Sequence, residues 1–261
     1  MTRSVLSAGE IGELEDRMGD FPIVGLARDL SAGTVVEPHH HRRGQLMYAS
    51  SGVMVIETRE GSWVIPPQRA IWVPEQIEHS FMPVTGLSLR NLLIAANAGP
   101  RMPASCTLIT VGNLLRELVL RMAEHPASFR SEAHRARVAE LILDELDDCP
   151  VAPLQLPEPR DPRLARICSA LRDNPADART LEDWADSAGA SARTLSRLFL
   201  SETGLSFAHW RRQARLLAAL VRLGQGQSVT TVAFDVGYDS PSAFIEMFRL
   251  TLGQTPGQYF C

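Results

Sequence analysis

Two stretches near the C-terminal end of the chain, SARTLSRLF (residues 191–199) and SPSAFIEMF (residues 240–248), share one arrangement of apolar residues. Each begins with a serine, and apolar side chains follow four and eight positions later. This spacing places the apolar side chains on one face of a short helix that the serine can cap. A short helical segment and a glycine, Gly189 or Gly237, precede each serine, so the sequence predicts two helix-turn-helix units.

In the first unit, TLED (residues 180–183) has the form of a capping box and predicts a helix over 181–188 that ends at Gly189. Ser191 then caps a second helix, whose expected buried residues are Leu195, Leu198 and Phe199. The opposite face carries Arg193, Ser196 and Arg197. Arginine can bond bidentately to guanine in the major groove, so this face predicts DNA contacts. The alternative is a solvated charged surface, which would be the default interpretation if the helix were not part of a repeated unit.

The second unit is predicted to start at Ser228, to run over 229–236 and to turn at Gly237. Pro241 suits the first position of the helix that Ser240 caps. Its expected outward residues are Ser242, Ala243 and Glu246. Glu246 can accept a hydrogen bond from a cytosine amino group but repels a phosphate, so we expect this unit to add less affinity or more selectivity.

A helix predicted over 207–223 separates the two units and would fix their spacing. Two recognition helices about 34 Å apart enter successive major grooves on one face of DNA. Arg211, Arg212 and Arg215 on this helix suit phosphate contacts, which position a protein without specifying sequence.

The first part of the chain has a different pattern, with short apolar segments separated by turns. The predicted strands are 46–49, 53–58, 62–65, 70–73 and 87–94. Strands at this spacing without helices between them predict a small β-barrel or sandwich. Helical periodicity follows over 107–125, with Leu114, Leu118 and Met122 on one face, and over 131–148, with Val138, Leu141, Ile142 and Leu146. This helical pair either covers the barrel or forms a homodimer, which we favour.

Five prolines between Pro150 and Pro162 predict a stiff linker and a domain boundary. The overall composition is that of a soluble globular chain, with 45% hydrophobic and 21% charged residues. Acidic residues outnumber arginines over 1–159, whereas arginines outnumber acidic residues over 160–261, which is a weak electrostatic indication of DNA binding. Four widely separated cysteines, no apolar stretch of membrane-spanning length and an acidic N-terminus indicate a cytoplasmic protein with reduced thiols.

The segment from Thr180 to Tyr259 resembles the DNA-binding domain of AraC/XylS-type transcription regulators. The matching stretches are SARTLSRLF, ETGLSFAHWRRQARL, SVTTVAFDVGYDSPSAFIEMFR and GQTPGQY. The resemblance covers both units, the helix between them and the closing segment. It implies base contacts from Arg193, Ser196, Arg197, Pro241, Ser242, Ala243 and Glu246. Many relatives carry a basic or polar residue at the position of Glu246.

Three histidines in the first part, His39, His41 and His79, would lie on separate strands of the barrel together with Gln45. Imidazoles in this spacing suit Zn, Ni, Fe or Mn, with Gln45 as a weak oxygen ligand. The spacing resembles the two cupin motifs, except that Gln45 stands where cupins carry a glutamate. A polar pocket without metal is the alternative, and no cofactor is required in that case.

Tyr48, Trp63 and Trp72 could stack on a planar effector inside the barrel, although aromatic residues at strand positions are more often plain core. The fold expected is α+β: a cupin-like sensing barrel (1–105), a helical dimerisation segment (106–149), a linker (150–162) and an all-α DNA-binding domain (163–261). We predict an effector-controlled transcription regulator that acts on promoter DNA, with RNA polymerase as a candidate partner.

Two other functions stay open at this stage. One is a cupin-type metal-dependent enzyme, such as a dioxygenase or isomerase, fused to a helical domain. The missing glutamate and the absence of an evident acid–base pair weigh against it. The other is a constitutive DNA-binding protein whose barrel only dimerises.

Overall fold

The computed structural model describes residues 5–6, 21–59, 61–98, 102–147 and 155–260. The chain divides into two compact units, one of Met1–Arg59 with Val64–Pro153 and one of Glu60–Trp63 with Leu154–Cys261. The linker prediction falls partly on residues 150–154, which lie outside the described residues. Two of the cysteines, Cys106 and Cys168, are described; both are buried and neither forms a disulfide bond. No described helix has the length and hydropathy of a membrane span.

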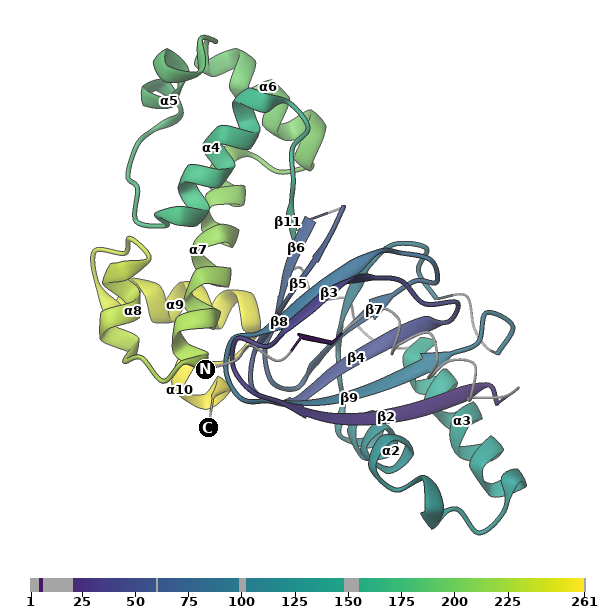
Figure 1. The fold of residues 1–261 in the computed structure, drawn as a ribbon. Coiled ribbons are helices and arrows are strands. Elements are labelled where there is room, and N and C mark those ends of the chain that lie inside the picture. The colour runs from purple at the N-terminus through teal and green to yellow at the C-terminus, as the bar shows by residue number, and fades with distance from the viewer. Residues whose placement is uncertain (1–4, 7–20, 60, 99–101, 148–154, 261) are drawn as a thin grey trace. The chain divides into compact units, whose positions relative to one another are not determined.

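Strands dominate the first unit and form two sheets (Figure 1). One sheet has the order β1 (Val5–Leu6), β3 (Val35–His39), β8 (His79–Pro83), β5 (Met54–Thr58), β6 (Gly61–Ile65), β11 (Gln155–Pro157). The pairing of β11 with residues 61–63 of β6 belongs to the second unit. The other sheet has the order β10 (Thr107–Thr110), β7 (Arg69–Val73), β4 (Gly44–Ser51), β9 (Leu87–Ile94), β2 (Ile23–Leu30).

Helices α2 (Asn113–Glu124) and α3 (Glu132–Asp147) cover the outer face of the second sheet (Figure 1). A short 3-10 helix, η1 (Pro126–Ser128), connects them. Leu46 and Leu92 from the strands pack with Leu115, Val119 and Ile142 from the helices in one apolar core. Burial of this apolar surface holds the helical pair on its own sheet. The pair therefore covers the barrel, which was one of the two roles that the sequence left open.

The predicted strands are confirmed, with small differences at their ends, but the prediction of helix from residue 107 is wrong. Thr107–Thr110 forms β10 and pairs with β7, because this segment is rich in β-branched residues that favour a pleated strand. The helix begins only at Asn113. Two residues assigned to the inner helical faces, Leu114 and Leu141, are 50% and 39% exposed; Leu115 and Leu143 are buried instead.

The second unit is helical beyond β11, as predicted. Its helices are α4 (Pro162–Asp173), α5 (Leu181–Ala188), α6 (Ala192–Thr203), α7 (Phe207–Gly224), α8 (Val229–Asp235), α9 (Pro241–Leu252) and α10 (Pro256–Tyr259). Helix α7 runs between the α5–α6 pair and the α8–α9 pair and contacts both α6 and α8 (Figure 1). Trp210, fully buried on α7, anchors the start of this helix by donating its indole N–H to the Pro157 carbonyl at 3.0 Å.

Candidate nucleic-acid interface and sensing site

The first helix-turn-helix is built by the caps that the sequence predicts. Thr180 and Asp183 form a reciprocal capping box at the start of α5. Gly189 ends this helix in the left-handed conformation at φ 63°, which glycine adopts without a Cβ clash. The Ser191 hydroxyl then accepts a hydrogen bond from the Thr194 N–H and starts α6. The left-handed Gly189 and the hydrogen bond from the Thr194 N–H to Ser191 therefore set the angle between α5 and α6.

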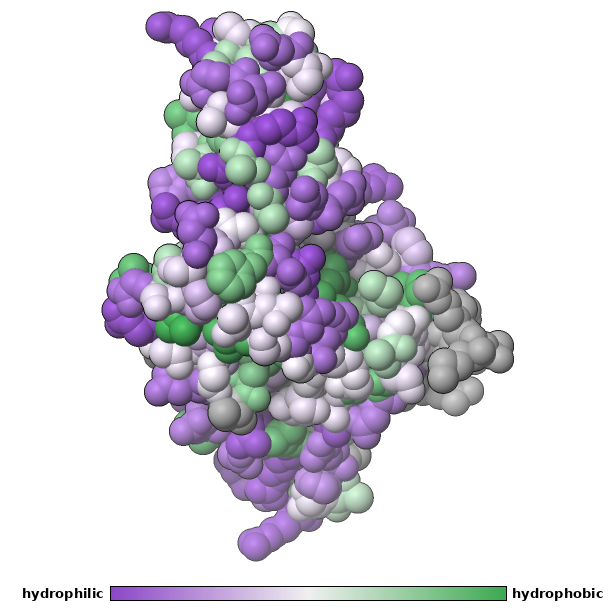
Figure 2. Space-filling view, turned by 90° about the vertical axis from the view of Figure 1, so that its left-hand side faces the viewer, coloured by the Kyte–Doolittle hydropathy of each residue, from purple (hydrophilic) through white to green (hydrophobic). Residues whose placement is uncertain are grey.

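Helix α6 has an apolar inner face and a basic outer face. Leu195 and Phe199 are fully buried, and the Phe199 ring packs edge-on against Phe207 with centroids 5.4 Å apart. Arg193, Ser196 and Arg197 are exposed, whereas Leu198 is only half-buried. Figure 2 shows the α5–α6 end of this unit as mainly hydrophilic. The structure thus brings the predicted DNA-reading residues together on one solvent-facing surface.

The second helix-turn-helix presents a less basic surface. Ser240 caps α9 by accepting from the Ala243 N–H, and Phe244 and Phe248 are fully buried beneath it. Ser242, Ala243 and Glu246 are exposed, and Pro241 is half-buried at the first helical position. The Glu246 carboxylate accepts from the Arg249 guanidinium at 2.8 Å and 3.1 Å, and these hydrogen bonds hold the pKa of Glu246 below its ordinary value. The acidic residue is therefore offset by a neighbouring cation on the same face.

Two of the three arginines expected to reach phosphates from α7, Arg211 and Arg215, are engaged within the unit. Arg215 donates to the Pro175 carbonyl at 2.9 Å and lies over the Tyr238 ring at 5.8 Å. Burial lowers the pKa of Arg215 from its ordinary value, as expected for a guanidinium withdrawn from water. Arg211 donates to the Arg179 carbonyl at 2.9 Å, whereas Arg212 on the same helix is exposed. In this arrangement Arg215 holds the loop before α5 and the second turn against α7.

The three predicted histidines do converge in the first unit. His39 ends β3, His41 follows it, and His79 begins β8; their exposed fractions are 6%, 6% and 2%. One potential ligand atom from each residue lies within 4.8 Å of those from the other two. The three histidines therefore form one buried cluster, but His41 lies in the loop after β3 and not on a strand of its own as the sequence predicted.

Hydrogen bonds define which histidine nitrogens carry protons. His39 Nδ1 lies 2.7 Å from the Glu37 carbonyl oxygen, and His79 Nδ1 lies 3.0 Å from the Ile77 carbonyl oxygen. A carbonyl oxygen only accepts, so both Nδ1 atoms donate, and in a neutral imidazole with this tautomer the Nε2 atom keeps its lone pair. Nε2 of His79 has no hydrogen-bond partner among the described residues. Metal-ligating histidines commonly donate the other ring N–H to a carbonyl in this way.

The surroundings keep two of the imidazoles neutral. Burial, and then the neighbouring His39, lower the pKa of His41 to about 4. The same two causes lower the pKa of His79 to about 3, against a weaker opposing effect of its hydrogen bond to Ile77. Neutral imidazole is the form that binds a metal ion, because a protonated nitrogen has no lone pair to donate.

The space between the two sheets, which we call the inner cavity, is small. His39, His41 and Gln45 line it together with Arg28 of β2, Asn91 of β9 and apolar residues of both sheets, and its volume is about 40 Å³. Asn91 is 7% exposed, and its Oδ1 has no hydrogen-bond partner among the described residues. Such a volume accommodates an ion and a water molecule, whereas pockets for organic ligands are roughly ten times larger.

A turn between β7 and β8 holds His41 in place. Gln76 adopts a left-handed conformation at φ 61°, which is uncommon for a residue with a side chain. Its backbone N–H donates to the His41 carbonyl at 2.9 Å, and its side-chain amide donates to the same oxygen at 3.3 Å. The turn therefore fixes the segment that carries His41 without contacting the imidazole.

The three aromatic residues expected to stack on an effector do not meet in the inner cavity. Tyr48 and Trp72 lie in the core between the second sheet and its helices. Gln45 faces the inner cavity, and residues an odd number of positions along a strand face the opposite side, which turns Tyr48 away from it. Trp72 pairs with Leu46 and shares that outer face. Trp63, 1% exposed on β6, belongs to the second unit.

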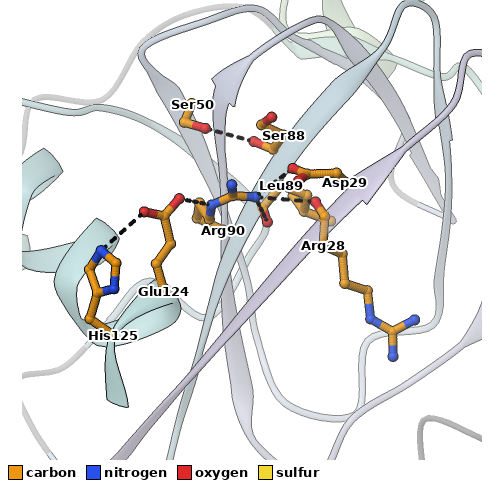
Figure 3. Close-up of polar contacts among 8 residues, drawn as sticks. All are labelled: Arg28, Asp29, Ser50, Ser88, Leu89, Arg90, Glu124 and His125. Atoms are coloured by element: carbon orange, nitrogen blue, oxygen red, sulfur yellow. Dashed lines mark hydrogen bonds and ion pairs between the residues drawn. The ribbon is translucent and has the colours of Figure 1, made fainter. Parts of the chain in front are cut away.

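A buried arginine connects the sheet to helix α2, and the sequence interpretation missed it (Figure 3). Arg90 of β9 donates from Nη1 to Asp29 of β2 at 3.0 Å and to the Arg28 carbonyl at 3.3 Å. Its Nε donates to Glu124 at the end of α2. The flanking residues on β9, Leu89 and Asn91, line the inner cavity. The sequence did contain a sign of this contact, because Arg90 and Asn91 are adjacent polar residues within an otherwise largely apolar strand.

Comparisons with known proteins cover both parts of the chain. Residues 184–260 match a family described as "Helix-turn-helix domain", and residues 24–198 match one described as "AraC-like ligand binding domain". The chain is 38% identical over 221 residues to HTH-type transcriptional regulator NimR of Escherichia coli (strain K12), which spans 85% of this chain and 81% of NimR. It is 37% identical over 131 residues to HTH-type transcriptional regulator RipA of Corynebacterium glutamicum, over 50% of this chain and 38% of RipA.

Among solved structures, ToxT from Vibrio cholerae O395 overlaps 92% of this chain and 97% of its own, with 12% identity and a TM-score of 0.39. A score of that size does not by itself establish a shared fold. The sequence similarity to NimR, in contrast, extends over most of both chains.

Proposed function

Because the chain belongs to the AraC family of transcription regulators, we propose that it binds promoter DNA through the exposed faces of α6 and α9 under the control of the N-terminal unit. The observation that supports these faces most directly is the exposure of Arg193 and Arg197 above a fully buried Leu195 and Phe199. A cation on this face can reach guanine O6 and N7 in the major groove.

Helices α6 and α9 would contribute unequally to DNA affinity. On α6, Arg193, Ser196 and Arg197 supply base contacts and most of the affinity. On α9, the contacts come from Pro241, Ser242, Ala243 and Glu246, and the Glu246–Arg249 pair favours selectivity over attraction to phosphates. Arg212, which is exposed, is the α7 arginine best placed for a phosphate contact, and the half-buried Arg211 would add a second; the engagement of Arg215 supports a positioning role.

We further propose that His39, His41 and His79 bind a divalent metal ion, with the Gln45 amide oxygen as a fourth ligand. The neutral imidazoles, the lone pair of His79 and the size of the inner cavity support this assignment. Three nitrogen ligands without a carboxylate favour Zn²⁺ or Ni²⁺ over the harder Mn²⁺. The ion would act as effector or as a fixed part of the sensing unit, and a cavity of about 40 Å³ supports a regulatory rather than a catalytic role.

The domain organisation proposed is a sensing barrel over 1–105, a helical segment over 106–149, a linker over 150–162 and a DNA-binding domain over 163–261. The start of α4 at Pro162 supports the last boundary. We propose that the chain acts in the cytoplasm as a homodimer through α2 and α3, whose exposed Leu114 and Leu141 would add apolar contact, and that RNA polymerase is its partner at the promoter.

The DNA-reading face is tested with genomic fragments selected by the wild-type protein. Arg197→Ala should weaken binding to a selected fragment by about tenfold to a hundredfold, as expected for loss of one bidentate contact. The matched control is Arg166→Ala, which removes an exposed arginine from α4 of the same unit. Equal footprints for wild type and Arg197→Ala would contradict the assigned face. Metal analysis of wild type and His79→Leu tests the histidine site separately.

A further inference from the structure

A second cavity in the first unit has the size of a binding site for an organic molecule. It has a volume of about 430 Å³ and lies on the outer side of the second sheet, beside α3. We call it the outer cavity; its lining includes Gly44, Trp72, Glu75, Ile94, Met102 and Leu143. Pockets that enclose small organic ligands typically measure roughly 300–1,000 Å³. The outer cavity falls in this range, and the inner cavity of about 40 Å³ does not.

One wall of the outer cavity is a fixed aromatic ring. Trp72 is 6% exposed, and its indole N–H donates to the Pro103 carbonyl at 2.9 Å, which sets the orientation of the ring. Gly44 lies directly against the six-membered part of the indole, where any Cβ would collide with it. A side chain at position 44 would therefore displace the ring. The glycine lets the indole lie close against the β4 backbone, and both residues form part of the cavity wall.

The charge in the lining of the outer cavity is negative. Glu75 is the single charged side chain among the described residues that line it, and the rest of the lining is apolar or small. A carboxylate next to an aromatic face attracts a cation and disfavours an anion, and tryptophan is the strongest aromatic partner for a cation. The lining therefore favours a ligand that is planar, apolar and positively charged.

We propose that the outer cavity binds a planar aromatic cation, such as an aromatic amidine or amine, which stacks on Trp72 and pairs with Glu75. This site is separate from the proposed metal site, and binding there does not require a metal ion. A regulatory effect of such a ligand rests on the proposed function. Leu143 of α3 lines the cavity, so an occupant would contact a helix of the proposed dimer segment.

The probes are 2-naphthamidine, 2-naphthamide and 2-naphthoate, which share one ring system and carry a positive, zero and negative charge. Binding to the full chain is measured by isothermal calorimetry and ligand-observed NMR. We expect the amidine to bind most tightly and the naphthoate least. Glu75→Gln should weaken amidine binding about fivefold and leave the neutral amide unchanged, because it removes one partly solvated ion pair.

A second variant separates the cavity from non-specific adsorption. Ala96→Trp fills the cavity from its exposed rim and should abolish amidine binding without lowering the melting temperature. Ala32→Trp, which adds the same side chain at an exposed turn between β2 and β3, is the matched control and should bind as wild type does. His79→Leu should also retain amidine binding, so that a failure of the metal site and a failure of this site give different results.

Two results would overturn the proposal. One is equal affinity of the wild type for the three probes, which would remove the role of Glu75. The other is unchanged amidine binding in Ala96→Trp, which would place the ligand elsewhere on the protein.

Discussion

The buried histidines predict a specific loss of stability in the first unit between pH 7 and pH 5. An unfolded chain binds protons at histidine near pH 6.5, whereas the folded state holds the pKa of His41 at about 4 and that of His79 at about 3. The unfolded state therefore takes up more protons than the folded state between these values. Stability is fully present above pH 6.5 and falls as the pH is lowered through the window toward about 3.

The size of this effect follows from linkage. For each of the two histidines, lowering the pH from 7 to 5 costs about 2 kcal/mol of unfolding free energy, so the pair costs about 4 kcal/mol. Carboxylates with lowered pKa values, such as Asp29, lose their contribution only below about pH 4 and do not enter this window. A domain with a typical total of 5–15 kcal/mol would lose a large fraction of its stability.

The assay is hydrogen exchange at increasing urea, followed by mass spectrometry in the presence of EDTA. Peptides from β4 and β9 report the free energy of unfolding of the first unit, and peptides from α7 report the second unit as an internal reference. The double variant His41→Leu/His79→Leu should lose most of the pH dependence in β4 and β9. His40→Leu, at an exposed position between His39 and His41, should retain it.

A wild-type change of less than about 1 kcal/mol between pH 7 and pH 5 in β4 and β9 would refute the burial of two neutral imidazoles. An equal change in wild type and double variant would refute the assignment of the pH dependence to these residues.

Three further variants test individual contacts. Glu246→Ala releases the arginine that it pairs with, so non-specific DNA affinity should rise and the salt dependence should steepen by about one phosphate contact in a filter-binding titration. Arg215→Met should lower the unfolding free energy of the second unit by about 2 kcal/mol, because it removes the contacts of Arg215 with the Pro175 carbonyl and the Tyr238 ring. Arg212→Met should reduce DNA affinity and leave the unfolding free energy unchanged. The reverse pattern would show that Arg215 binds phosphate and does not hold the fold together. Arg90→Met should cost the first unit about 3 kcal/mol in urea unfolding, and the exposed Arg116→Met less than about 1 kcal/mol.

The helical half was predictable because its signals are local. A cap such as Ser191 or Thr180 acts within three residues of itself, and Gly189 ends its helix through its own backbone conformation. The burial of Phe199 follows from the same spacing that placed Arg197 outside. The role of Arg215 was not predictable, because its partners, Pro175 and Tyr238, come from separate segments and their approach is a property of the tertiary fold.

In the barrel, residue types were predicted better than their directions. The spacing of His39, His41 and His79 predicted that these residues meet, and their ligand atoms lie within 4.8 Å of one another. The direction of Tyr48 depends on which face of β4 carries Gln45, because side chains switch from one face of a strand to the other at each residue. Strands β2, β3 and β8 escaped prediction because they alternate polar and apolar residues weakly, and their pairing with distant strands decides their conformation.

The turn between β7 and β8 places the two candidate sites of the first unit in physical contact. Glu75 lines the outer cavity, and its neighbour Gln76 holds the His41 carbonyl through two hydrogen bonds. On the other side, Gly44 of the outer cavity precedes Gln45 of the inner one. A ligand that shifts this turn would also shift His41, and a metal ion that draws His41 toward His79 would pull on Gln76. Because such coupling is reciprocal, a metal ion would change the affinity for an aromatic cation by the same factor as the cation changes the affinity for metal.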